Sequence, residues 1–179
     1  MFKKTINIFF ILILPFVFYS QDVKKEPTVL KRDFRGVVLL ENYETVIEKL
    51  KKDNLILLPS TDFDLMDEDD RKTIIAKIPP YIERIYYQFE DDKLFIISIF
   101  FDNKKFSYLE VYKKLKEKYG NPVLYNSLQA IWEDEKTKIV LDNLPSIKYI
   151  DKDILNKTVS GERENENKDK IKRSIIDEF

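Results

Sequence analysis

The residue types available for catalysis are limited in this chain. Its 179 residues include no histidine and no cysteine. This composition excludes the imidazole base of a Ser–His–Asp triad, thiol nucleophiles, disulfides, and zinc sites with histidine or cysteine ligands. It also excludes a lipid-modified cysteine at an export junction. Any active site must use Asp, Glu, Lys, Tyr, Ser or Thr, so enzymatic activity stays open but the composition favours a binding protein.

Two groups of acidic residues contain the kind of carboxylates that a hydrolase uses in pairs. Glu90, Asp91 and Asp92 lie at one expected hairpin tip, and the Glu-Asp-Glu sequence of residues 133–135 lies at another. A glycoside hydrolase uses two carboxylates at a fixed separation, whereas acidic residues are common in turns without any catalytic role. A carboxylate-dependent hydrolase acting on envelope glycan or peptide is therefore an alternative function.

No metal site, cofactor or catalytic residue is predicted. The acidic run over residues 62–70 fails the calcium-loop pattern, because Met66 holds a ligand position and Asp67 holds the glycine position. We interpret this run as a solvated loop that leads into a short helix through residues 74–75. Ser98 leaves a Ser–Lys dyad open, but the motifs that accompany such dyads in known enzymes are missing.

The N-terminus has the layout of a secretory signal. Lys3 and Lys4 form a basic start, residues 8–19 form the apolar run IFFILILPFVFY, and Ser20 is a small residue at a cleavage position. The apolar run is shorter than the ~20 residues that cross a bilayer as a helix. We expect a signal peptide over residues 1–20 and export to a periplasmic or extracellular space. An uncleaved anchor is the alternative, because Phe18 is large for its place before the cleavage point.

Two amphipathic helices are predicted downstream. The first begins at Tyr43 after an Asn42 N-cap, and the second follows a capping box formed by Ser107 and Glu110 and ends at Gly120. The spacing i, i+3, i+4, i+7 defines one apolar face on each helix. These faces consist of Tyr43, Val46, Ile47 and Leu50 in the first helix, and of Tyr108, Val111, Tyr112, Leu115 and Tyr119 in the second.

The strand pattern predicts an α+β fold with an antiparallel sheet of about five strands and two helices packed on one face. A linker over residues 21–33 precedes a single domain over 34–155, and a charged tail over 156–179 is expected to be disordered or loosely helical. The two helices align with each other, which is what a tandem α-β-β-β duplication produces, although two unrelated Lys-rich helices would also align. The predicted strands cover residues 81–89, 94–101, 129–133, 137–142 and 146–150, with 55–58 as a further short strand.

Both faces of the strand over 94–101 are apolar, so both require cover. The two helices cover one face. The other face is covered by the segment over 55–80, or a partner or ligand docks there. Along the strand over 94–101, the residues expected on one side are Leu94, Ile96, Ser98 and Phe100. The aromatic side chains of this region, which include Trp132, suit either a core or a binding platform.

The stretch from Tyr86 to Asp151 resembles small uncharacterised exported domains of bacterial envelopes. The resemblance is carried by the segments 89–94 (FEDDKL), 118–122 (KYGNP) and 148–151 (KYID), together with Trp132. It implies a shared fold and no particular activity. The helix–sheet layout is also similar, by architecture alone, to outer-membrane assembly lipoproteins and to secreted enzyme-inhibitor domains.

The charge balance of the chain argues against a nucleic acid as its partner. The chain has 31 basic and 32 acidic residues, which gives no electrostatic footprint for a nucleic acid. The sequence therefore predicts an exported envelope module that binds a protein or small ligand, with no stable membrane span after signal removal. The hydrolase and a secreted enzyme-inhibitor domain are the alternatives. In the tail, Ile171, Ile175 and Phe179 recur every four residues, which suits a short amphipathic helix for a partner.

If the signal interpretation is right, the protein isolated from an exporting host begins at Gln21, because cleavage after Ser20 is the expected processing step. Mass spectrometry of the intact protein measures this directly. Replacing Lys3 and Lys4 by Glu is the control and should retain the precursor in the cytoplasm. A full-length mass in the exported fraction would contradict cleavage and support the uncleaved anchor.

Overall fold

The structure is a computed structural model that describes residues 29–58 and 72–176. The predicted signal peptide, most of the predicted linker and the acidic run over 62–70 lie outside the described residues. The strands are β1 (Asp33–Phe34), β2 (Val37–Val38), β3 (Thr73–Ile78), β4 (Ile82–Glu90), β5 (Lys93–Phe101), β6 (Leu124–Tyr125), β7 (Gln129–Glu133), β8 (Thr137–Asp142) and β9 (Ser146–Asp151). The helices are α1 (Tyr43–Lys52), α2 (Tyr108–Tyr119) and α3 (Lys152–Ile176).

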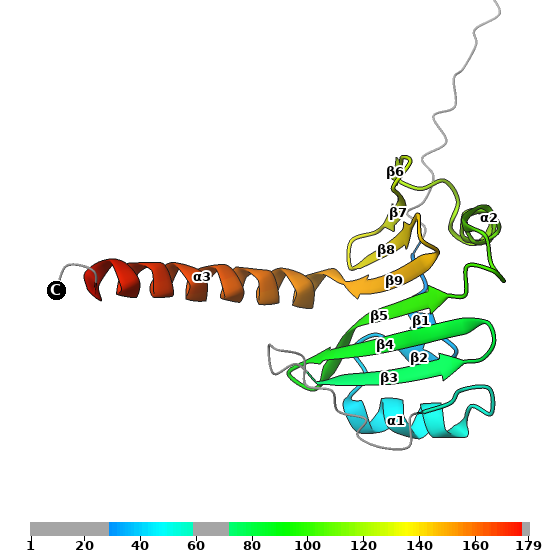
Figure 1. The fold of residues 1–179 in the computed structure, drawn as a ribbon, viewed down its shortest axis with the longest axis horizontal. Coiled ribbons are helices and arrows are strands. Elements are labelled where there is room, and N and C mark those ends of the chain that lie inside the picture. The colour runs from blue at the N-terminus through cyan, green and yellow to red at the C-terminus, as the bar shows by residue number, and fades with distance from the viewer. Residues whose placement is uncertain (1–28, 59–71, 177–179) are drawn as a thin grey trace, which may run out of the picture.

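The main sheet is antiparallel and has two similar halves. Its strand order is β3-β4-β5-β9-β8-β7-β6, and β1 and β2 form a separate small hairpin. Each half consists of a helix followed by a three-stranded meander, α1 with β3–β5 and α2 with β7–β9, and the last strands of the two meanders pair with each other (Figure 1). This topology is the one that a tandem α-β-β-β arrangement predicts, with β6 added at one edge.

Within residues 29–58 and 72–176 the main sheet has seven strands, so the prediction of about five strands is wrong. The main error concerns β3, where residues 74–75 were expected in a short helix. In the sequence TIIAKI, Ile74, Ala76 and Ile78 alternate with more exposed residues and are buried, and the strand pairs along β4. β-Branched residues with a period of two favour a strand. The predicted strand over 55–58 is reduced to one bridge between Leu57 and Lys77.

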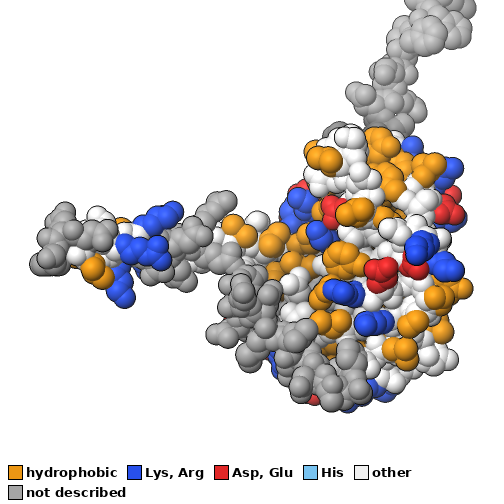
Figure 2. Space-filling model, in the orientation of Figure 1, with side chains coloured by type: hydrophobic (Ala, Val, Ile, Leu, Met, Phe, Trp, Pro, Cys, Tyr) orange, Lys and Arg blue, Asp and Glu red, His pale blue; other side chains and the backbone are white. Residues whose placement is uncertain are grey.

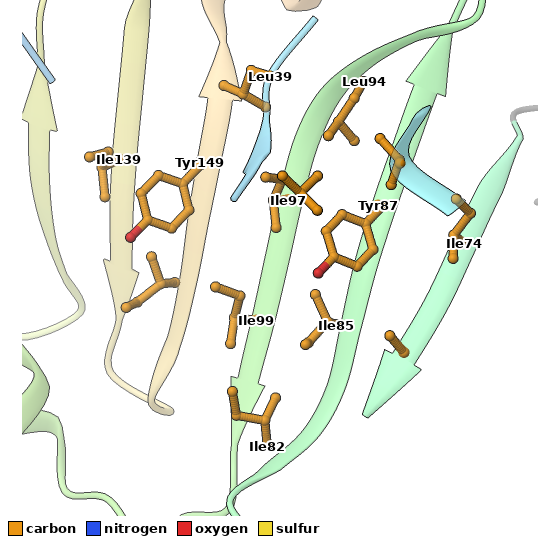
Figure 3. Packing of buried hydrophobic residues seen from close by; sticks show 14 of the residues in the cluster. Leu39, Ile74, Ile82, Ile85, Tyr87, Leu94, Ile97, Ile99, Ile139 and Tyr149 are labelled. Atoms are coloured by element: carbon orange, nitrogen blue, oxygen red, sulfur yellow. The ribbon is translucent and has the colours of Figure 1, made fainter. Parts of the chain in front are cut away.

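The hydrophobic core lies between the sheet and the two short helices, as expected from the sequence. Figure 3 shows buried side chains from neighbouring strands projecting together from one face of the sheet. Buried residues of both α1 and α2 belong to the same cluster as these strand residues. The register aligns one row of core residues across six strands, namely Ile74, Tyr87, Ile97, Tyr149, Ile139 and Trp132.

The predicted helix caps are confirmed. The Asn42 side chain accepts a hydrogen bond from the backbone N–H of Thr45 at 2.9 Å. Ser107 and Glu110 form the reciprocal capping box, with 2.9 Å between the Ser107 backbone nitrogen and the Glu110 carboxylate. Gly120 ends α2 with φ of 80°, a conformation that glycine adopts without a steric penalty. Local sequence therefore fixes both ends of α2.

The folded region begins inside the predicted linker over 21–33. Leu30 is buried in the core, and its backbone N–H donates to Asp134 Oδ2 at 2.8 Å. β1 and β2 follow at once, joined by Arg35 and Gly36, which both have positive φ. The structured domain therefore extends a few residues further toward the N-terminus than its predicted start at residue 34.

The charged C-terminal stretch is helical in the structure, whereas the sequence predicts a disordered or loosely helical tail from residue 156. α3 leaves the sheet at the end of β9 and projects away from it (Figure 1). Ile171, Ile175 and Ile176 are exposed near its far end, where they line a shallow groove with Lys168 and Lys172. Among the described residues, no helix combines the length and the apolar character required to cross a membrane.

Candidate binding face

The register of the sheet defines which residues lie on the face opposite α1 and α2, here called the second face. Its central row consists of Ile75, Tyr86, Ser98, Lys148, Val140 and Ile131. A register shift between Gln88 and Phe89 moves Leu94 onto the core face, opposite Phe89. The expectation that Leu94 shares a face with Ile96, Ser98 and Phe100 is therefore wrong, because a simple period of two does not continue through a bulge.

The described parts of the segment over 55–80 do not cover the second face. β3 is itself part of the sheet, and Leu57 lies beside its outer edge through the bridge to Lys77. In Figure 1 the β1–β2 hairpin lies behind β4 and β5, so Figure 2, drawn in the same orientation, shows the opposite face of these strands. Hydrophobic, basic and acidic side chains alternate across the surface in that view.

An aromatic pair occupies the β4–β5 part of the second face. The rings of Tyr86 and Phe100 pack edge to face, with centroids 5.7 Å apart and an interplanar angle of 87°. Phe100 remains 37% exposed. The Arg84 guanidinium donates to the Tyr86 hydroxyl at 3.3 Å, and this hydrogen bond raises the pKa of Arg84. The aromatic pair and Arg84 together therefore present two aromatic rings and a positive charge on this part of the second face.

A polar band separates this pair from the rest of the face. Lys148 Nζ lies 3.1 Å from Asp142 Oδ2, and the same oxygen accepts a hydrogen bond from the Ser146 hydroxyl at 3.2 Å. Ser98 is the direct cross-strand neighbour of Lys148, so the structure does bring a serine and a lysine together. The ammonium group of Lys148 is engaged with Asp142, however, so the contact that the structure shows is an ion pair and not a Ser–Lys dyad.

Beyond the polar band, the second face is aliphatic and partly covered by α3. Ile131, Val140 and Ile150 form a small buried cluster, and Ile96 and Leu155 pack against it. Because Leu155 belongs to the first turn of α3, the helix covers this part of the face before it projects into solvent. The exposed portion of the face is therefore bounded on one side by the beginning of α3.

Charged residues hold the first turn of α3 against the end of the sheet. The Asp151 side chain is 2% exposed and forms an ion pair with Arg32. Its second oxygen accepts a hydrogen bond from the backbone N–H of Ile154 at 3.0 Å, which caps the first turn of α3. Lys152 Nζ lies 2.6 Å from a Glu133 carboxylate oxygen and donates to the backbone carbonyl of Asp134 at 2.8 Å.

The two acidic tips proposed for hydrolysis lie at the same end of the sheet but far apart. β5, β9 and β8 separate the centres of the two hairpins, which corresponds to roughly 14 Å at normal strand spacing. This exceeds the carboxylate separations of about 5 to 9.5 Å used by glycosidases. Glu133 is paired with Lys152, and Asp92 accepts a hydrogen bond from the backbone N–H of Tyr43 at 3.3 Å. The structure therefore does not bring the predicted acids together as a catalytic pair.

Three of the described carboxyl groups, Asp53, Glu110 and Asp134, have lowered pKa values. The pKa of Asp53 is lowered by its hydrogen bond with Arg35, and that of Glu110 by hydrogen bonds from Ser107. Burial tends to raise the pKa of Asp134, but backbone N–H bonds and the nearby Arg32 outweigh it, so the net shift is downward. Among the described residues, each carboxyl with a shifted pKa is thus a stronger acid than usual, the opposite of a general acid.

Most of the aromatic residues considered as a platform belong to the core. Trp132, Tyr87 and Tyr149 are buried, and burial raises the pKa of both tyrosines. The indole N–H of Trp132 donates to the carbonyl of Gly120 at 2.8 Å and so ties α2 to β7. Tyr86 is the aromatic residue of this group on the second face. Sequence reasoning did not propose Arg84 or Lys148 as site residues. Arg84 lies two residues before Tyr86 on β4, and cross-strand register brings Lys148 beside Ser98.

This combination of elements defines a class of α+β domain: two helix-and-meander units that share one sheet, with an amphipathic second face and a helix at its margin. The chain belongs to the TP0088 domain family, whose model matches residues 32–161. That match includes both units and the first turns of α3 and contains the stretch from Tyr86 to Asp151. No curated protein and no solved structure matches the chain.

Asp134 should contribute to stability in a pH-dependent way. Because its pKa in the folded state is lowered, its contribution is present above the ordinary carboxyl pKa of about 3.9 and is lost as the pH falls through the folded value. Asp134→Asn should therefore lower the free energy of unfolding at neutral pH and make its loss in acid less steep. Urea unfolding between neutral and acid pH measures both effects.

The matched control is Glu135→Gln, which neutralises an exposed carboxylate in the same turn. It should leave the pH profile close to that of the unmodified protein. Equal profiles for both variants would contradict the assigned role of Asp134.

Proposed function

We propose that this chain is an exported, non-catalytic module of the bacterial envelope that binds a partner protein through its second face. The observation that carries this proposal is the arrangement of Tyr86, Phe100 and Arg84 beside the Lys148–Asp142 pair. Aromatic residues and arginine are the types that most often dominate the energy of protein interfaces. Here they lie on rigid strands, so little conformational entropy would be lost on binding.

The composition of the face favours a protein over a small ligand. Small-molecule sites are concave and enclose most of the ligand surface, whereas this face is one side of an open sheet. A non-obligate protein interface combines apolar anchors with a polar surround and is no more apolar overall than other surfaces. The aromatic pair, the polar band and the margin formed by α3 fit that description.

The charge pattern also suggests what the partner presents. Arg84 is exposed and its guanidinium donates a hydrogen bond to the Tyr86 hydroxyl, while Lys148 and Ser146 both contact the Asp142 carboxylate. A partner segment with an aliphatic or aromatic anchor and a nearby carboxylate would find both complements on this face.

Support for the non-catalytic part comes from the carboxylates. The two acidic tips are separated by three strand spacings. Asp134 accepts backbone hydrogen bonds within its own turn, and its pKa is lowered. Support for export comes from the basic, apolar and small residues of the first twenty positions.

Site-specific crosslinking in cells tests the binding face. A photoreactive amino acid replaces Phe100 in the full chain, and the control places it at Leu109, which is 54% exposed on α2. We expect one discrete crosslinked protein in the envelope fraction from position 100 and none from position 109. Lys148→Glu, on the same face, should reduce the yield at least tenfold by reversing a charge in the polar band.

The opposite results would overturn the proposal. If positions 100 and 109 gave the same products, or if Lys148→Glu left the yield at position 100 unchanged, the second face would not be the binding surface. Recovery of the protein in the cytoplasmic fraction alone would overturn the assignment to the envelope.

A further inference from the structure

Four chain connections form a continuous row at the end of the sheet opposite α3, here called the tip row. In Figure 1 the turn between β6 and β7 lies at the top of the view and the other three connections lie at the right. Backbone hydrogen bonds join them: Asp102 N to Tyr81 O at 3.0 Å, Phe101 N to Pro145 O at 3.1 Å, and Asn143 N to Leu128 O at 2.8 Å. The row therefore has a fixed geometry. It consists of residues 79–81, 102–106, 143–145 and 126–128, each adjoining strands of the main sheet.

Large apolar side chains project from three of these connections. Tyr81 is 51% exposed, Leu128 is 70% exposed and Leu144 is 80% exposed. Each belongs to a separate turn, so no local sequence pattern groups them. Single exposed apolar residues are common on soluble proteins, but a row built from separate turns at one end of a sheet forms a surface of its own.

The fourth connection supplies positive charge. Lys104 and Lys105 are both exposed, and within the described part of the chain neither forms an ion pair. The acidic residue of this connection, Asp102, is half-buried, and its side chain accepts a hydrogen bond from the backbone N–H of Lys104 at 2.8 Å. The tip row thus combines apolar projections with two exposed cations.

We infer that the tip row docks on the surface of a membrane containing anionic lipids. The tips extend over about five strand spacings, roughly 24 Å, and the apolar side chains project singly between polar turn residues. A rigid protein partner would need a separate pocket for each of these side chains. The boundary between headgroups and acyl chains is fluid, so it accommodates them without a preformed complementary surface. The charge complementarity is with lipid phosphates, which attract Lys104 and Lys105.

Each residue type has a defined place in this arrangement. Leu128 and Leu144 enter the acyl boundary, and Tyr81 lies at the level of the headgroups, where aromatic side chains with a polar end are enriched. α3 leaves the other end of β9, so docking leaves α3 and the second face accessible. The inference does not depend on the binding function proposed for the second face.

Because the chain has no cysteine, one introduced cysteine carries an environment-sensitive fluorophore at a single site. The label is placed at Leu144→Cys in the full chain, and the control label at Leu40→Cys, which is 41% exposed and bonded to the other end of β5. The probes are vesicles of phosphatidylcholine alone and of phosphatidylcholine with phosphatidylglycerol. We expect a shift to shorter emission wavelength at position 144 only, and only on vesicles with phosphatidylglycerol.

Removing both charges with Lys104→Gln and Lys105→Gln should weaken the partition roughly thirtyfold, since each lysine near an anionic surface contributes about a factor of five. Leu128→Ser in the labelled protein should also weaken it. Three outcomes would overturn the inference: no shift at position 144 with any vesicle, which would leave a protein as the occupant; equal shifts at positions 40 and 144, which would mean binding through another segment; or a partition that is insensitive to the lysine changes.

Discussion

The pairing of β5 with β9 is the interaction on which the rest of the structure depends. It joins the last strands of two helix-and-meander units into one sheet, with Ile97 opposite Tyr149 and Ile99 opposite Ile147 on the core side. Because cross-strand partners share a face, this pairing forces both units to place their helices on the same side. A shift of one residue would move these core residues to the second face and place Ser98 and Lys148 on the core side.

The same pairing creates the second face. Ser98 and Lys148 meet across it, the aromatic pair lies on the β4–β5 side, and the aliphatic cluster under Leu155 lies on the β8–β9 side. Core packing alone does not specify the chemistry of this face, so its side chains are free to serve recognition. The Arg32–Asp151 pair then fixes α3 at its margin. Removing Arg32 would leave the buried Asp151 carboxylate without its charge partner, and breaking a buried ion pair in this way typically costs about 3 to 5 kcal/mol.

Sequence reasoning was most accurate where short-range signals decide the structure. Asn42, Ser107, Glu110 and Gly120 lie at helix ends, and each acts within a few residues of itself. β3 was missed because acidic residues before it suggested a helix start, while its pairing with β4 depends on residues further along the chain. Leu94 was assigned to the wrong face because a bulge in β5 is a property of the pair of strands rather than of one strand.

The candidate surfaces were harder to anticipate for the same reason. The sequence indicated an apolar second face on β5, and the hairpin with β4 places Arg84 and Tyr86 beside it. Lys148, however, becomes a neighbour of β5 only through the pairing of β5 with β9. The tip row depends on four turns that are separated along the chain. The carboxylates attracted attention by composition, yet turn formation, helix capping and ion pairing account for Asp92, Glu110 and Glu133.

Amide hydrogen exchange, resolved by residue, tests most directly whether β5–β9 pairing makes the two units one cooperative structure. The account predicts that core amides of β4 and β5 exchange with the same free energy as those of β8 and β9, close to the free energy of global unfolding. A matching response to urea in both halves would support it. If residues 73–101 exchanged through an opening of clearly lower free energy while residues 129–151 stayed protected, the units would be independent and the central claim would be wrong.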